Sequence, residues 1–239
     1  MKSLTKTSII IPLKPPIKKQ FTATDIFLIL VNLLPLWGVW FRGWDAKQIF
    51  LVYCLESVII GLYNVLMMLL TTFVKKKDIW TNGSYSALVS GYWFVLFFII
   101  HYGFFLAVQI GIFLSISNFN TDTSTVKDFF YALHHLTLNA QTPPAVWLIL
   151  IFIATHGILV LKDFILTGNY KRASLGVLLF APYARVFVQQ FCVLIGGFFL
   201  QFGAGKIFIL VFVVVKIFFE SVLDYQKMLT ETAKAEQAD

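Results

Sequence analysis

The chain has 239 residues, of which 59% are hydrophobic and only 13% are charged. A water-soluble domain needs charged side chains over most of its surface, so this composition excludes an ordinary soluble protein and makes the lipid bilayer the expected partner. The formal net charge of +7 comes from basic residues in short clusters between apolar runs, which argues against a nucleic-acid-binding face.

The N-terminal segment, residues 1–24, is predicted to be a basic arm on the cytoplasmic side. It carries five lysines and three prolines before the first long apolar run. A cleaved signal peptide is not expected, because that run begins only near Asp25 and no Ala-x-Ala-like site follows it. We therefore expect a retained and largely irregular segment.

Six apolar runs are candidates for membrane-spanning helices, since about 20 apolar residues are needed to cross the hydrocarbon. They cover residues 25–41, 47–74, 86–116, 144–164, 181–202 and 206–226. The sequence thus predicts an all-α membrane protein with a bundle of about six transmembrane helices in one domain, 25–226, followed by a polar cytoplasmic tail, 227–239. The apolar stretch 173–181 before Pro182 is expected to be a short interfacial helix or a broken start to the fifth span.

The distribution of Lys and Arg between the loops predicts the orientation of the bundle. Thirteen of these residues flank the spans on one side and four on the other. Because positively charged loops resist translocation, the side with thirteen is expected to be cytoplasmic and to carry both termini, in a bacterial-type inner membrane. Trp37, Trp40 and Trp44 then lie at the outer end of the first span, at the headgroup level.

The longest connection, residues 117–143, is expected on the outer side. Its second half, residues 126–138, has apolar residues at helical spacing, which predicts a short amphipathic helix lying on the membrane surface. His134 and His135 are neighbours on this helix and point about 100° apart. We interpret them as surface residues and not as joint metal ligands.

Ionisable side chains within the spans are the best candidates for a functional site, because each costs about 2.5–3.5 kcal/mol at the bilayer centre unless it is partnered. Glu56, His101 and His156 fall near the middle of the second, third and fourth spans. Asn64 accompanies them, in the same span as Glu56. Two histidines and a carboxylate at compatible depth could hold a divalent metal or pass a proton between them. The alternative is that each histidine makes a local hydrogen bond that joins two helices.

A second group of charged residues is expected nearer the cytoplasm. Lys216, Glu220 and Asp224 recur every four residues on one face of the sixth span, and they can pair with one another and with Arg185 of the fifth. This spacing favours a structural ion-pair network between the two spans. The alternative is a site for an anion or a lipid headgroup in which Arg185 is the binding residue.

Short motifs connect the polar residues of the spans to a known kind of protein. The motifs are Glu56 with Gly61 and Asn64, His101-Tyr102-Gly103-x-Phe105, Pro182-Tyr183-x-Arg185, and Lys216 with Asp224. These motifs are spread over most of the chain. In them the chain resembles an uncharacterised family of bacterial six-helix inner-membrane proteins of unknown function. The resemblance implies that these polar residues define the family, and it lends no activity.

Three classes of function stay open from the sequence. The chain contains no His-Glu-x-x-His, Gly-x-Ser-x-Gly or phosphate-binding glycine loop, so no catalytic residue is predicted. The first class is an intramembrane binding or enzymatic site on Glu56, His101 and His156, with a metal or a small molecule as its ligand. The second is a small carrier or channel, and the third is a helical scaffold for a membrane partner or for a second copy of the chain.

Overall fold

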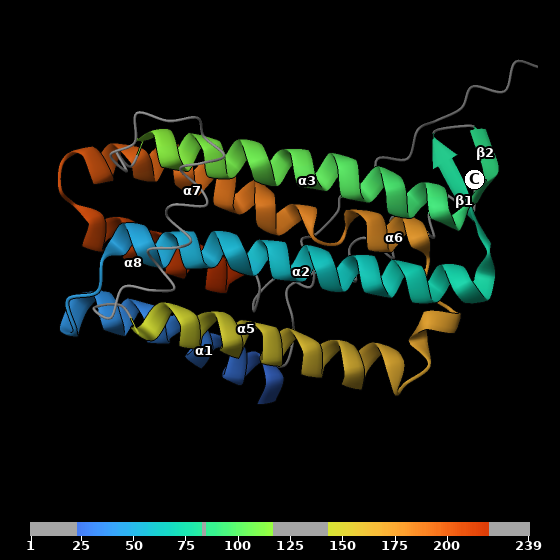
Figure 1. Cartoon of the computed structure of the whole chain (residues 1–239), viewed down its shortest axis with the longest axis horizontal. Coiled ribbons are helices and arrows are strands. Elements are labelled where there is room, and N and C mark those ends of the chain that lie inside the picture. Colours follow the sequence, from blue (N-terminus) through green and yellow to red (C-terminus); the bar gives the residue numbers. More distant parts are fainter. Residues whose placement is uncertain (1–22, 83–84, 117–142, 220–239) are drawn as a thin grey trace, which may run out of the picture.

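The computed structural model describes residues 23–82, 85–116 and 143–219. They form an elongated bundle whose longer helices run along its long axis (Figure 1). The elements are α1 (Ala23–Phe41), α2 (Ala46–Lys75), β1 (Lys77–Asn82), β2 (Tyr85–Ser90), α3 (Gly91–Ile116), α5 (Pro143–Val160), η1 (Leu161–Ile165), η2 (Asn169–Lys171), α6 (Leu175–Phe180), α7 (Tyr183–Gln201) and α8 (Gly205–Ile217).

Within the described part of the chain, four helical segments are long and apolar enough to cross a membrane. They are Ala46–Lys75, Gly91–Ser115, Val146–Ile165 and Leu175–Cys192, and a shorter apolar helix covers Ile26–Phe41. The chain is therefore a multi-pass α-helical membrane protein. Successive long helices run in opposite directions along the bundle (Figure 1), as six antiparallel passes would require, but the count of six and the orientation in the membrane stay predictions.

Helix α2 lies in the middle of the bundle and contacts α3, α5, α6 and α8 (Figure 1). It begins after Asp45, whose side chain accepts a hydrogen bond of 2.7 Å from the Lys47 amide and so caps the first turn. It ends at Lys75, and the next residue, Lys76, has a positive φ of 62°. A capped start and a sharp end set the length of α2, and its contacts on several sides make it the element around which the polar site is built.

The apolar core has one cluster at each end of α2. Toward the start of the helix, the Phe50 ring packs against Phe113, Phe208 and Phe212 with centroid distances of 4.6, 5.0 and 4.9 Å. Toward its end, Met68 packs in a second cluster with residues of α3, α6 and α7. Along α2, the buried polar residues Glu56, Ser57 and Asn64 lie between Phe50 and Met68, so apolar packing encloses them on both sides.

The predicted all-α fold needs one correction, because β1 and β2 form an antiparallel hairpin with Lys77 opposite Ser90 and Asn82 opposite Tyr85. The predicted third span begins at residue 86, whereas the structure has a strand there and begins α3 only at Gly91. From residue 86 to residue 90 exposed and half-buried side chains alternate, which is the period of a strand. Residues 86–90 were assigned to the third span because they adjoin its long apolar run, and the alternation within them was not considered.

The short helix predicted before Pro182 is confirmed as α6, and the chain breaks between it and α7 at Ala181 and Pro182. Proline has no amide hydrogen to donate, which accounts for the interruption. The two helices together give the spanning segment Leu175–Cys192. Other predictions lie outside the described residues: most of the N-terminal arm, the helix at 126–138 with His134 and His135, Glu220, Asp224 and the C-terminal tail.

Candidate functional site: a buried carboxylate surrounded by basic side chains

Glu56 of α2 is buried, with 2% of its surface exposed. The basic side chains of His156 (α5), Arg185 (α7) and Lys216 (α8) all contact its Oε1 atom. The distances are 3.2 Å from His156 Nε2, 3.1 Å from Arg185 Nη1 and 3.2 Å from Lys216 Nζ. Lys216 Nζ also lies 3.0 Å from Oε2. This Glu56 cluster therefore joins α2 to α5, α7 and α8 through a single carboxylate.

Lys216 is the most enclosed cation of the Glu56 cluster. Its ammonium group donates a short hydrogen bond to Asn32 Oδ1 of α1. It also lies over the rings of Tyr53 and Phe152, at 5.1 and 5.8 Å from their centroids. A carboxylate, an amide oxygen and two ring faces together replace the water that an ammonium ion loses on burial.

The side chains of the cluster differ in how far they are exposed. Side-chain exposure is 3% for Glu56 and 2% for Lys216, but 19% for Arg185 and 13% for His156. A small molecule that reached the cluster would therefore meet Arg185 and His156 first. Lys216 lies behind them, against the rings.

A neutral polar network lies next to the cluster, and we call it the Ser57 network. Ser57 Oγ donates to Gln189 Oε1 at 2.7 Å, and Gln109 Nε2 donates to the same oxygen at 2.9 Å. Gln189 Nε2 donates to the Tyr53 carbonyl oxygen at 3.0 Å. The network joins α2, α3 and α7 through hydroxyl and amide groups.

Close helix packing holds one more hydrogen bond beside Ser57. The Tyr102 hydroxyl donates to the Ser57 carbonyl oxygen at 2.9 Å. The Tyr102 ring lies directly on Gly61, where a Cβ atom would be only 2.5 Å from Tyr102 Cε1. Glycine at position 61 therefore permits the approach of α3 to α2 that this hydrogen bond needs.

The structure places His101 and Asn64 away from the cluster. His101 Nδ1 lies 2.7 Å from the Tyr183 hydroxyl, and its ring packs between Phe97 and Phe105. Asn64 Nδ2 donates to the Leu178 carbonyl oxygen at 2.9 Å and so joins α2 to α6. Of the three residues predicted to share a site, the structure brings only Glu56 and His156 into contact. His101 instead makes a local hydrogen bond between two helices, which was the alternative prediction.

The structure also changes the grouping of the basic residues, because Arg185 and Lys216 join Glu56 in one cluster. Glu56 lies ten residues after the start of α2 and Lys216 eleven after the start of α8. Both helices start at the same end of the bundle (Figure 1), so a rise of 1.5 Å per residue puts both at a depth of about 15 Å. Arg185 is expected from the sequence to reach Glu220 or Asp224, which lie outside the described residues; the acidic partner seen in the structure is Glu56.

Some partners at the site were not predicted from the sequence. Asn32, Tyr53 and Ser57 were not assigned to it, although each is buried and bonded to a member of one of the two groups. The available signal was the four-residue spacing of Arg185 and Gln189, which puts both on one face of α7. That face predicts partners for both residues on one neighbouring helix, and α2 supplies them as Glu56 and Ser57.

A metal ion is not supported by the geometry. In the ranges that the structure describes, His, Cys, Asp and Glu side chains form no group of three or more that could hold a metal. The predicted ligands Glu56, His101 and His156 are therefore not arranged as a metal site. Arg185 and Lys216 already contact the carboxylate, and their positive charges would repel a divalent cation at this position.

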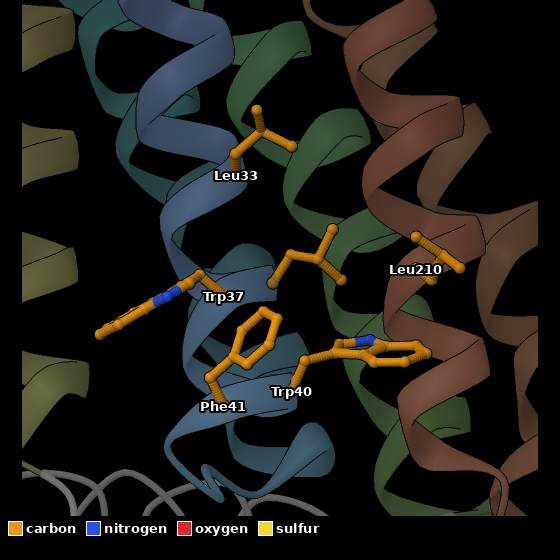
Figure 2. A pocket seen from close by; sticks show the side chains of 6 residues that line it. Leu33, Trp37, Trp40, Phe41 and Leu210 are labelled. Carbon is orange, nitrogen blue, oxygen red and sulfur yellow. The ribbon is translucent and has the colours of Figure 1, made fainter.

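An apolar groove of about 360 Å³ lies near the end of α1, on the side of α8. Figure 2 shows its lining by side chains of α1 and α8. The lining residues are Leu33, Leu36, Trp37, Trp40, Phe41 and Leu210. This surface offers contact area to apolar chains and no group for acid–base or ion chemistry, so the Glu56 cluster stays the candidate functional site.

The fold and the site define a class: multi-pass α-helical membrane proteins with a buried charged cluster inside the helix bundle. A model of a family of unknown function, DUF6498, matches residues 15–237, and the chain belongs to this family. Comparisons with curated proteins and with solved structures give no match. The sequence-based prediction of an uncharacterised family is thus confirmed, while its bacterial origin and its six helices stay predictions.

Proposed function

We propose that the Glu56 cluster is an intramembrane binding site for a small anionic molecule, with a carboxylate or phosphate group as the part that is recognised. The observation that carries the proposal is the convergence of His156, Arg185 and Lys216 on one carboxylate oxygen. Basic side chains arranged around one oxygen are also the arrangement that binds the oxygen of an external anion. In this proposal Glu56 is the resident counter-ion that the ligand replaces.

The energetics of buried charge support a role beyond stability. A buried ion pair is often no more stabilising than apolar residues of the same volume, because desolvation offsets the attraction between the charges. An ionisable group within a membrane span is therefore a functional-site hypothesis by default. Arg185 and His156 are partly exposed, so they are the side chains of the cluster that an approaching anion would contact first.

Charge balance suggests how the ligand replaces Glu56. If Glu56 takes up one proton as one singly charged anion binds, the carboxylate becomes neutral and the charge of the site does not change. Neutral Glu56 still accepts a hydrogen bond, and Arg185 is released to pair with the ligand in a bidentate manner. Binding of an anion with a proton is the chemistry of a small carrier, so this route favours a carrier over a scaffold.

The second candidate is a permanent ion-pair clamp, which would suit a helical scaffold. The observation that favours it is the enclosure of Lys216 by Asn32, Tyr53 and Phe152. A clamp and a binding site predict different behaviour when Glu56 loses its charge. The clamp only becomes weaker, whereas the binding site loses its internal competitor.

The test is an anion screen of the thermal stability of the full chain in detergent, with simple carboxylates and inorganic phosphate as probes. Wild type is compared with Glu56→Gln and with the control Asp163→Asn, which removes an exposed carboxylate on η1. We expect at least one probe to raise the melting temperature of Glu56→Gln by several degrees more than that of the control. Equal shifts in the two variants, or none, would contradict the binding site and leave the clamp.

We further propose that the chain has six spans in an inner membrane, with both termini in the cytoplasm. The Lys and Arg asymmetry supports this orientation, and tryptophans at opposite ends of the bundle support a membrane between them. Trp37 and Trp147 lie at the end where α1 stops and α5 starts, and Trp80 and Trp93 lie at the hairpin end (Figure 1). A green fluorescent protein fused after Asp239 should fluoresce, while an alkaline phosphatase fused there should be inactive; the reverse result would overturn the orientation.

A further inference from the structure

The hairpin of β1 and β2 has two faces with different surroundings. On the inner face, the Trp80 ring packs against Phe94 and Phe180, with centroid distances of 5.8 and 6.4 Å. Asp78 Oδ2 on the same face accepts a hydrogen bond of 2.7 Å from the Leu175 amide and so holds the hairpin to α6. These contacts fix the hairpin on the bundle.

The outer face of the hairpin carries an exposed apolar pair. Ile79 and Leu88 are direct partners in the register, and they are 47% and 66% exposed. Cross-strand partners on one face lie side by side, so these side chains form a continuous apolar patch at the tip of the bundle. The alternation of the strands keeps this patch directed away from Trp80.

Basic residues lie around the base of the hairpin. Lys76 connects α2 to β1 and Lys77 begins β1, while Lys171 ends η2 and Arg172 follows it; all four are exposed. The two segments are neighbours, since Lys75 Nζ donates to the Arg172 carbonyl oxygen at 3.5 Å. The nearby carboxylate of Asp78 is engaged by the Leu175 amide and lies 3.9 Å from Lys75 Nζ. The exposed charge beside the apolar patch is thus mainly positive.

The aromatic residues indicate the level of this surface relative to the membrane. Trp80 and Trp93 are in edge contact, with ring centroids 5.5 Å apart. Tryptophan is enriched at the boundary between hydrocarbon and headgroups. Trp80 is part of the hairpin, so this preference supports a position of the hairpin at headgroup level. There its apolar patch and the flanking basic side chains would meet acyl chains and phosphate groups.

We propose that the hairpin end of the bundle is a binding site for anionic phospholipids. Ile79 and Leu88 insert at the boundary of the acyl chains, and Lys76, Lys77, Lys171 and Arg172 bind the headgroup phosphates. Apolar insertion and electrostatic attraction act together in surface-bound segments, and each basic residue near an anionic surface contributes about fivefold in affinity. This site is independent of the Glu56 cluster and holds whether or not that cluster binds a ligand.

The first test measures lipid selectivity of the full chain reconstituted in phosphatidylcholine vesicles, with spin-labelled phosphatidylglycerol and spin-labelled phosphatidylcholine as probes. Wild type should prefer the anionic lipid, and the variant K76Q/K77Q/K171Q/R172Q should lose several-fold of that preference. The control R42Q/K206Q removes two exposed cations at the opposite end and should keep most of it. Absence of a preference in wild type, or an equal loss in the control, would overturn the proposal.

The second test locates the apolar patch with a nitroxide label at Ile79→Cys or Leu88→Cys. The native Cys54 and Cys192 are buried, so the label is directed to the new cysteine. In anionic vesicles the label should be more accessible to oxygen, which dissolves in lipid, than to a water-soluble nickel complex. Greater accessibility to nickel would place the hairpin in water, as a docking surface for a soluble protein requires, and would overturn the lipid site.

Discussion

Two polar groups on one helix meet different partners in this bundle. Glu56 faces basic side chains of α5, α7 and α8, while its neighbour Ser57 lies in a network of amide groups of α3 and α7. Consecutive residues of a helix point about 100° apart, so α2 contributes Glu56 to the charged cluster on one side and Ser57 to the neutral network on another. Helix α7 contributes to both, through Arg185 and, one turn later, Gln189.

The two groups differ in what remains when one side chain is removed. When a hydroxyl or amide of the Ser57 network is removed, the remaining groups are neutral and keep other hydrogen bonds. When Glu56 is removed, the cations that faced it stay where the dielectric constant is low and lose their strongest attraction. We therefore expect substitutions in the Glu56 cluster to lower the free energy of unfolding much more than substitutions in the Ser57 network.

The largest effect is expected for Glu56→Ala. Removing one partner of a buried ion pair typically lowers the free energy of unfolding by about 3–5 kcal/mol. The measurement is reversible unfolding in mixed detergent micelles, with Asp163→Asn as the control for loss of an exposed carboxylate. A decrease below about 1 kcal/mol, typical of exposed pairs, would mean that the carboxylate does not organise the bundle.

A double-mutant cycle of Glu56→Gln and Lys216→Met should show the next largest effect. The two side chains are in contact, so their changes should not add, and the coupling energy should be about 1–3 kcal/mol. The double variant removes both charges together and should be less destabilised than the sum of the two single variants. Simple additivity within experimental error would contradict a direct Glu56–Lys216 interaction.

Gly61→Ala tests the close packing on the Ser57 side of α2. The new methyl group would overlap the Tyr102 ring, and overpacking of this kind lowers the free energy of unfolding by about 1–3 kcal/mol. Gly103→Ala is the matched control, because no neighbouring atom lies within 4 Å of its added Cβ. The control should be neutral or slightly stabilising, because alanine has a higher helix propensity than glycine. Equal losses in the two variants would therefore show that the loss does not come from overlap with the Tyr102 ring.

The smallest effect is expected for Ser57→Ala. Hydrogen bonds between helices in membranes contribute on average about 0.6 kcal/mol, and Gln189 keeps its bonds to Gln109 and to the Tyr53 carbonyl. The same unfolding assay measures the change. A loss as large as that of Glu56→Ala would remove the distinction between the charged cluster and the neutral network.

The sequence predicted the class of the protein because membrane-spanning helices depend mainly on the length of apolar runs. The predicted spans 47–74 and 144–164 lie close to the spanning segments Ala46–Lys75 and Val146–Ile165. The hairpin was missed because alternation over residues 86–90 merges into the apolar run that follows. A run length measures hydrophobicity and not its period, so it does not separate a strand from the first turns of a helix.

The members of the site were easier to predict than their arrangement. The energetic cost of charge in lipid is enough to select Glu56, His156, Arg185 and Lys216 from the sequence, since such residues need partners. The sequence did not predict the contacts of Arg185 and Lys216 with Glu56, because position along a single span does not show that α2 and α8 start at the same end of the bundle. The predicted pairing with Glu220 and Asp224 involves residues outside the described ranges and stays a prediction.

The position of His101 could not be predicted for a different reason. Helix α3 is apolar around its whole circumference, so its sequence does not indicate which face turns inward. In the structure, Tyr102 and Gln109 of α3 bond to α2 and α7, and His101 lies toward Tyr183 of α7. Depth along the helix was therefore insufficient to place this side chain beside Glu56.

Competition between Glu56 and an anion for Arg185 can be measured by equilibrium titration with the anion that stabilises Glu56→Gln most in the thermal screen. Wild type, Glu56→Gln and the double variant Glu56→Gln/Arg185→Gln are compared. If Glu56 competes with the ligand for Arg185, Glu56→Gln should bind at least tenfold more tightly than wild type, and the added Arg185→Gln change should reverse that gain. Equal affinity in all three proteins would place anion binding elsewhere and contradict the proposed site.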